Sequence, residues 1–93
     1  MRRYVIERDI PDIGGFTPAQ FCEAAATSNA ALAKLDGKVQ WVHSYVVQNK
    51  TFCIYLSPDE DLVHQHAKLS GFPVSRITES TAVIDPTTAH AAT

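Results

Sequence analysis

The chain has 93 residues and a formal net charge of −2, with 45% hydrophobic and 19% charged residues. This length suits one globular domain with a single core, and the weak, scattered charge excludes the basic surface of a nucleic-acid-binding protein. No apolar run approaches the roughly 20 residues that span a bilayer, and the N-terminus does not resemble a signal peptide. We expect one cytoplasmic domain, residues 1–86, with a flexible tail over residues 87–93, and neither nucleic acid nor a membrane as a partner.

Residues 3–8 are rich in strand-forming types, and Pro11 with Gly14-Gly15 ends the run. A helix is predicted directly afterwards, because several start signals coincide: Thr17 as N-cap, Pro18 in the first helical position and Gln20 closing a capping box. Apolar or small residues then recur at helical spacing until Gly37: Phe21, Ala25, Ser28, Leu32 and Leu35. The alanines among them should let the helix lie close to a sheet.

Two strand-like runs follow, residues 39–47 and 51–56, joined by the polar connector Gln48-Asn49-Lys50, so a hairpin is predicted. A second helix is predicted to begin with Ser57 as N-cap and to end at Gly71. Its apolar stripe is Leu62, His66 and Leu69, and residues 77–84 form the last predicted strand.

The element order is therefore β-α-β-β-α-β, which predicts an α+β, ferredoxin-like sandwich with a four-stranded antiparallel sheet and two helices on one face. The register of the hairpin decides what lies on the other, open face. A symmetric turn centred on Asn49 would pair His43 with Tyr55 and Tyr45 with Cys53, leaving Phe52 and Ile54 to the helices. A two-residue turn would shift the pairing by one residue. We prefer the first register because it gives the helices an aliphatic floor.

In that register the open face collects a carboxylate, an imidazole, two phenols and an indole. These groups could supply a general base, hydrogen-bond donors and an aromatic wall. The alternative is that the aromatic side chains form a dimer interface. Cys53 would act as a nucleophile only beside a positive group. The candidate catalytic residues are His43, Glu7 and Tyr45, and the candidate ligand-binding residues are Arg8, Trp41, Tyr55, Cys53 and His66.

Several stretches carry a family resemblance: Glu7-Arg8-Asp9, Trp41-Val42-His43-Ser44-Tyr45, His66 through Pro73, and Val83 through Thr88. In these the chain resembles a widespread bacterial family of unassigned function, related to small nickel-binding, ferredoxin-like proteins. The resemblance implies a dimeric α+β barrel, in which the sheets of two copies face each other, and hence a homodimer.

The nickel-binding relatives typically have a histidine near the end of the first strand and an H-x-x-x-H-G pattern that closes the second helix. Arg8 and Ser70 stand at two of those positions here, and only His66 is kept. The resemblance therefore leaves His66 as a candidate ligand for nickel or another divalent transition metal, and His43 could replace one of the lost ligands. Such sites need several nitrogen donors.

The leading hypothesis is a homodimeric domain that binds a small organic molecule or a metal ion near these residues. A cofactor-independent cyclase, isomerase or monooxygenase with His43 or Glu7 as general base is the alternative, and a purely structural dimer is the third.

Overall fold

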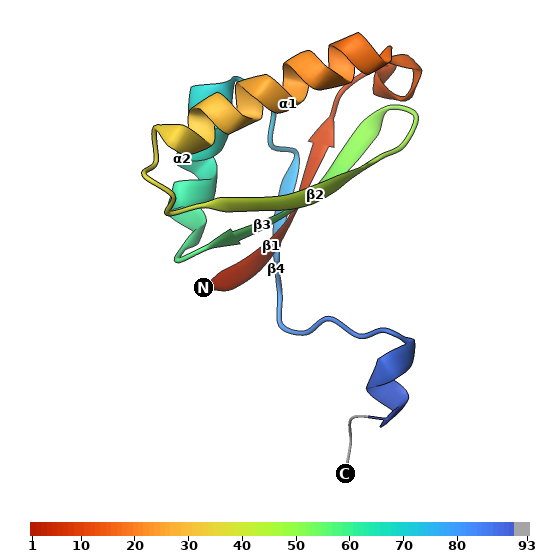
Figure 1. The fold of residues 1–93 in the computed structure, drawn as a ribbon, viewed down its shortest axis with the longest axis vertical. Helices are drawn as coiled ribbons and strands as arrows, with labels where there is room; N and C mark the ends of the chain where they lie inside the picture. The colour runs from red at the N-terminus through yellow and green to blue at the C-terminus, as the bar shows by residue number, and fades with distance from the viewer. Residues whose placement is uncertain (91–93) are drawn as a thin grey trace.

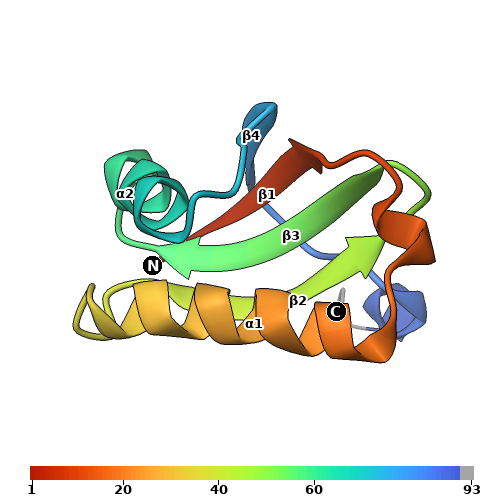
Figure 2. The same ribbon diagram turned by 90° about the horizontal axis from the view of Figure 1, so that it is seen from above.

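A computed structural model describes residues 1–90. Its strands are β1 (Arg2–Asp9), β2 (Gln40–Val46), β3 (Lys50–Ser57) and β4 (Arg76–Ser80), and its helices are α1 (Pro18–Ala33) and α2 (Glu60–Ser70). Two short 3-10 helices, η1 (Ile13–Gly15) and η2 (Pro86–His90), follow β1 and β4. The strands form one antiparallel sheet in the order β2-β3-β1-β4. Both helices cover the same side of it (Figures 1 and 2), which confirms the ferredoxin-like fold.

Helix α1 begins as predicted. The Thr17 hydroxyl accepts a hydrogen bond from the Gln20 amide at 3.2 Å, and the Gln20 side chain accepts one from the Thr17 amide at 2.8 Å. This reciprocal pair is the capping box. Phe16 and Phe21 lie beside it with ring centroids 5.9 Å apart, so the chain enters the helix at a fixed angle.

Helix α2 begins two residues later than predicted. Ser57 is still part of β3 and pairs with Arg2, so it cannot be the N-cap. Asp59 takes that role, because its carboxylate accepts a hydrogen bond from the Leu62 amide at 2.9 Å. On the predicted stripe Leu69 is 45% exposed, and the face of α2 turned to the sheet consists of Val63, His66 and Ala67.

The last strand is shorter than predicted, because β4 ends at Ser80. Its partner strand β1 begins at Arg2 and pairs with β4 over residues 3–7, so residues 81–84 extend past the end of the paired region. The chain then runs away from the sheet to η2 (Figure 1). The end of the predicted tail, residues 91–93, lies outside the described residues.

The preferred register of the hairpin was wrong. Tyr45 pairs with Phe52 and His43 with Ile54, as a two-residue turn requires, and a bulge at Val42 then shifts the register so that Trp41 pairs with Tyr55. The bulge places Trp41 and Ser44 on one face, where the indole Nε1 donates a hydrogen bond to the Ser44 hydroxyl at 3.0 Å. The predicted open face is therefore divided between the two sides of the sheet.

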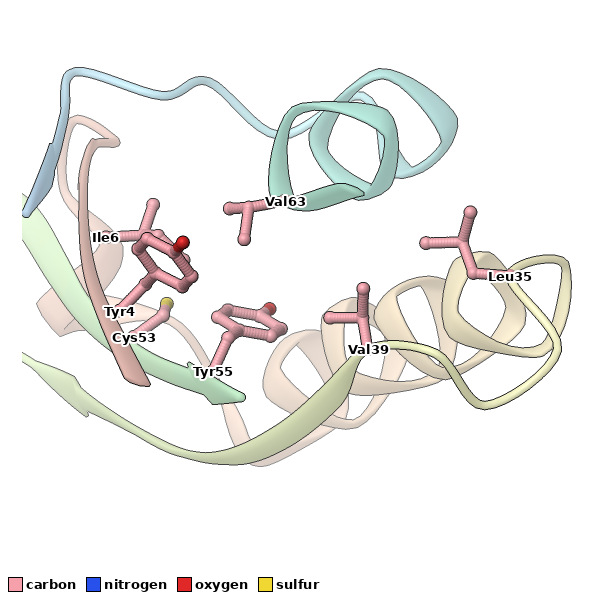
Figure 3. Packing of buried hydrophobic residues seen from close by; sticks show 7 residues of the cluster. All are labelled: Tyr4, Ile6, Leu35, Val39, Cys53, Tyr55 and Val63. Carbon is pink, nitrogen blue, oxygen red and sulfur yellow. The ribbon is translucent and has the colours of Figure 1, made fainter. Parts of the chain in front are cut away.

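The core lies between the sheet and the helices. Tyr4, Ile6, Cys53 and Tyr55 point from β1 and β3 toward Val63 of α2 (Figure 3). Side chains along β1 alternate between the two faces of the sheet. The helix side has the buried residues Tyr4, Ile6 and Arg8, and the other side has the half-buried residues Arg3, Val5 and Glu7. Among the described residues there is no helix with the length and hydropathy of a membrane span.

Candidate functional site

A cavity of ≈ 640 Å³ separates α1 from the sheet. Helix α1 has 16 residues and α2 has 11, so at 1.5 Å per residue they are about 24 and 17 Å long. Helix α1 packs against α2 and touches the sheet through Ser28, whose hydroxyl lies 3.5 Å from that of Tyr55. Its N-terminal half lies beyond the region that α2 covers (Figure 2). The cavity fills that uncovered region.

The cavity exists because small side chains face each other. Ala24, Ala25 and Ser28 line it from α1, and opposite them Ser44, Thr51 and Cys53 line it from β2 and β3. The alanines were expected to bring the helix close to the sheet. Instead these small side chains leave open volume between α1 and the sheet. Larger apolar side chains also line the cavity: Ile10, Ile13, Phe16, Phe21, Trp41 and Phe72.

Arg8 is the buried charge of this cavity. The residue is 2% exposed, and its Nη1 donates a hydrogen bond to the Pro73 carbonyl at 3.0 Å. Its guanidinium carbon lies over the Tyr55 ring, 5.8 Å from the centroid, and over the Phe72 ring, 5.7 Å from the centroid. Within residues 1–90, Nε and Nη2 have no hydrogen-bond partner, and Arg8 forms none of the salt bridges. Burying a cation without a counter-ion is costly, so this arrangement needs an explanation.

A chain of hydroxyl groups and one imidazole lies beside Arg8. The Ser28 hydroxyl is 3.1 Å from His66 Nε2 and 3.5 Å from the Tyr55 hydroxyl. Burial raises the pKa of Tyr55, so its phenol remains a donor at neutral pH. Burial first, and then the charge of Arg8, lower the pKa of His66 from its usual 6.5, so the imidazole is neutral. Arg8 is therefore the charged member of this group.

The lowered pKa of His66 predicts a loss of stability in acid. Below pH 6.5 the unfolded chain takes up a proton on His66 that the folded chain resists until the pH reaches its lower folded pKa. The free energy of unfolding should therefore fall as the pH decreases from 6.5 toward that value. Urea denaturation followed by circular dichroism between pH 7.5 and 5 measures the slope, which should be shallower in His66→Leu.

His64→Leu is the matched control, because His64 lies on the exposed side of the same helix, 3.7 Å from Glu60. It should keep the wild-type slope. An unchanged slope in His66→Leu would show that other groups cause the acid sensitivity.

The open face of the sheet holds the three candidate catalytic residues. His43 packs edge-on against the exposed Tyr45, with ring centroids 4.9 Å apart. Glu7 accepts a hydrogen bond from Lys50 Nζ at 3.2 Å and lies 3.9 Å from Arg76 Nε. Half-buried Val5, Phe52 and Ile54 lie among them. The predicted homodimer would use this face, and it stays a prediction.

The structure thus divides the candidate residues into two groups. Four of them line the cavity: Arg8, Trp41, Cys53 and Tyr55. His66 contacts two lining residues, Ser28 through its Nε2 and Tyr55 through its ring. His43, Glu7 and Tyr45 are on the opposite face of the sheet. Sequence reasoning did not identify six further lining residues: Phe16, Phe21, Ser28, Thr51, Phe72 and Pro73. The small residues on the side of α1 that faces the sheet could have indicated a cavity there.

Fold and cavity together define a small ferredoxin-like α+β protein with a ligand-sized space between helix and sheet. Residues 4–79 match the model of a family described as "Nickel responsive protein SCO4226-like", and the chain belongs to that family. The crystal structure of SCO4226 from Streptomyces coelicolor A3(2) is similar, with a TM-score of 0.73 and 14% identity over 88% of this chain and 99% of that chain. This likeness establishes the fold, and the family match confirms the resemblance predicted from sequence. No curated protein matches the sequence.

The residues described here do not fit a nickel site. Nickel favours several imidazole nitrogens together, but residues 1–90 contain no group of three His, Cys, Asp or Glu side chains that could hold a metal ion. His66 offers Nδ1 alone, since Nε2 contacts Ser28, and the neighbouring Arg8 is a cation. His43 lies on the other face of the sheet, so it cannot share a metal ion with His66.

Proposed function

We propose that this protein binds a small organic molecule in the cavity between α1 and the sheet. The observation that carries the proposal is the cavity itself, whose ≈ 640 Å³ falls within the range of about 300 to 1,000 Å³ found for ligand sites. Its mostly apolar wall with a few polar groups is typical of such sites. The ligand would lie on the helix side of the sheet, not on the open face.

An organic ligand is favoured over a metal ion because of the side chains around Arg8. The name of the family points to a response to nickel, yet the cavity wall offers aromatic rings, hydroxyl groups and a guanidinium in place of a set of nitrogen and carboxylate donors. Binding is also favoured over catalysis by His43 or Glu7. Both lie on the far side of the sheet from the cavity, and Glu7 is engaged by Lys50.

Blocking the cavity should abolish binding. Ala25 lines the cavity from α1, so the phenyl ring of Ala25→Phe would occupy the space of a ligand. The neutral fluorescent probe N-phenyl-1-naphthylamine should bind wild type with a rise in emission and saturate at one probe per chain. In Ala25→Phe the affinity should fall about 10-fold or more, equivalent to at least 1.4 kcal/mol.

Ala26→Phe provides the control, because Ala26 is exposed on the next position of the same helix and does not line the cavity. Its probe affinity should equal that of wild type. Nickel chloride is tested in parallel by thermal unfolding. Absence of probe binding to wild type, or stabilisation by nickel that persists in Ala25→Phe, would overturn the proposal.

A further inference from the structure

The guanidinium of Arg8 has one edge in use and one edge free. Nη1 is held by the Pro73 carbonyl, while the two atoms without a partner among residues 1–90 are Nε and Nη2. In a planar guanidinium the N–H bonds of Nε and Nη2 on their shared edge are parallel. That edge is the one that forms two-pronged hydrogen bonds with a carboxylate.

From this edge we infer that the ligand is an apolar monocarboxylate whose carboxylate pairs with Nε and Nη2 of Arg8. The inference rests on the proposed function and names the chemical class of the ligand. The carboxylate supplies the two acceptors and the counter-charge that the buried guanidinium lacks.

The charge balance of the cavity favours one carboxylate over a phosphate. Asp9 is the other charged residue of the wall, and its carboxylate lies 3.7 Å from Lys50 Nζ, at an exposed position. Arg8 therefore offers one unbalanced positive charge. A monocarboxylate neutralises it, whereas a dianionic phosphate would leave a buried negative charge. The remaining wall, with Ile13, Phe16 and Phe21, suits an uncharged apolar body.

Access to Arg8 requires the movement of a neighbouring side chain. Nε and Nη2 each expose less than 1 Å² of surface, so a carboxylate cannot reach them in the ligand-free arrangement. Phe72 lies over the guanidinium and is half-buried, on the segment that follows α2. We infer that Phe72 changes rotamer when the ligand binds, since side-chain rearrangements of this kind are common on binding.

The test compares matched ligands that differ in one group. Octanoate and 4-phenylbutanoate, with their primary amides, are titrated against the bound naphthylamine probe at pH 7.5. In wild type each carboxylate should bind about 10-fold or more tightly than its amide. In Arg8→Met the affinity for the carboxylates should fall about 30-fold or more, so the preference over the amides should disappear.

Arg2→Met is the control, because Arg2 lies on the same strand with its side chain 62% exposed, and it should keep the wild-type preference. Three results would overturn the inference. They are equal binding of acid and amide by wild type, an undiminished preference in Arg8→Met, and displacement of the probe by sodium sulfate as effective as by the carboxylates. The wild-type comparison decides this even if Arg8→Met fails to fold. Naphthylamine binding that Ala25→Phe blocks, without any preference for carboxylates, would leave the proposed function standing and refute this inference alone.

Discussion

Without a ligand, Arg8→Met should be more stable than the wild-type protein. Methionine fills much of the same space but removes a buried charge and two nitrogen atoms that have no hydrogen-bond partner in residues 1–90. Replacing buried ionic groups by apolar ones of similar volume often stabilises a protein by about 1 to 4 kcal/mol. The losses are smaller: one hydrogen bond to the Pro73 carbonyl, at an exposed residue that water can solvate, and the contacts with Tyr55 and Phe72. Urea denaturation at pH 7.5 measures the difference.

The same strand provides the reference for this stability measurement. Arg2 lies 3.7 Å from Glu79 at the surface, and an exposed pair of this kind contributes about 1 kcal/mol or less. Arg2→Met should therefore change the free energy of unfolding very little. If Arg8→Met unfolded more easily than wild type by more than about 1 kcal/mol, the existing contacts of Arg8 would already compensate its burial, and no ligand would be needed to explain it.

A residue that lowers the stability of the fold and lines a cavity is best explained by a role in binding. Natural proteins tolerate such local losses where binding or catalysis requires them. The combination of higher stability and weaker carboxylate binding in one variant would therefore distinguish a binding residue from a structural one, since a structural residue would lose stability when replaced.

The start of α1 was predictable because its signals are local. Thr17, Pro18 and Gln20 act within one helical turn, and the hydrogen bonds they form depend little on the rest of the chain. The start of α2 shows the limit of this reasoning. Ser57 and Asp59 are both good N-caps, and the choice between them depends on whether Ser57 is still paired in the sheet with Arg2, which is a long-range contact.

The faces of the hairpin were not predictable because one residue decides them. The bulge at Val42 lets Trp41 and Ser44 share a face, and strict alternation along the strand cannot produce that pairing. Strand β1 does alternate strictly, so Glu7 lies in line with Val5 and Arg8 lies on the helix side. The cavity itself arises from small residues on three separate elements, so its volume could not be read from any single stretch.

Gly14→Ala should destabilise the fold and loosen the cavity wall together. A Cβ at Gly14 would lie 2.9 Å from the Gln48 Cα and 2.9 Å from the Val47 carbonyl oxygen, both of them backbone atoms. The Gly14 amide also donates a hydrogen bond to the Gln48 carbonyl at 3.0 Å, so η1 cannot retreat without losing that bond. Overpacking of this kind costs about 1 to 3 kcal/mol, measurable by urea denaturation.

Gly15→Ala separates this close approach from a general effect of replacing glycine. No atom lies within 4 Å of a Cβ at Gly15, so the variant should be neutral or stabilised by up to about 1 kcal/mol through the unfolded chain. Ile13 and Phe16 flank the pair and line the cavity, and a shift of η1 would move both. Gly14→Ala should therefore also weaken naphthylamine binding, while Gly15→Ala should not. The opposite outcome is that the two variants show the same free energy of unfolding and the same naphthylamine affinity. In that case the position of η1 does not depend on its contact with the β2–β3 turn, and α1 and the sheet hold the cavity wall.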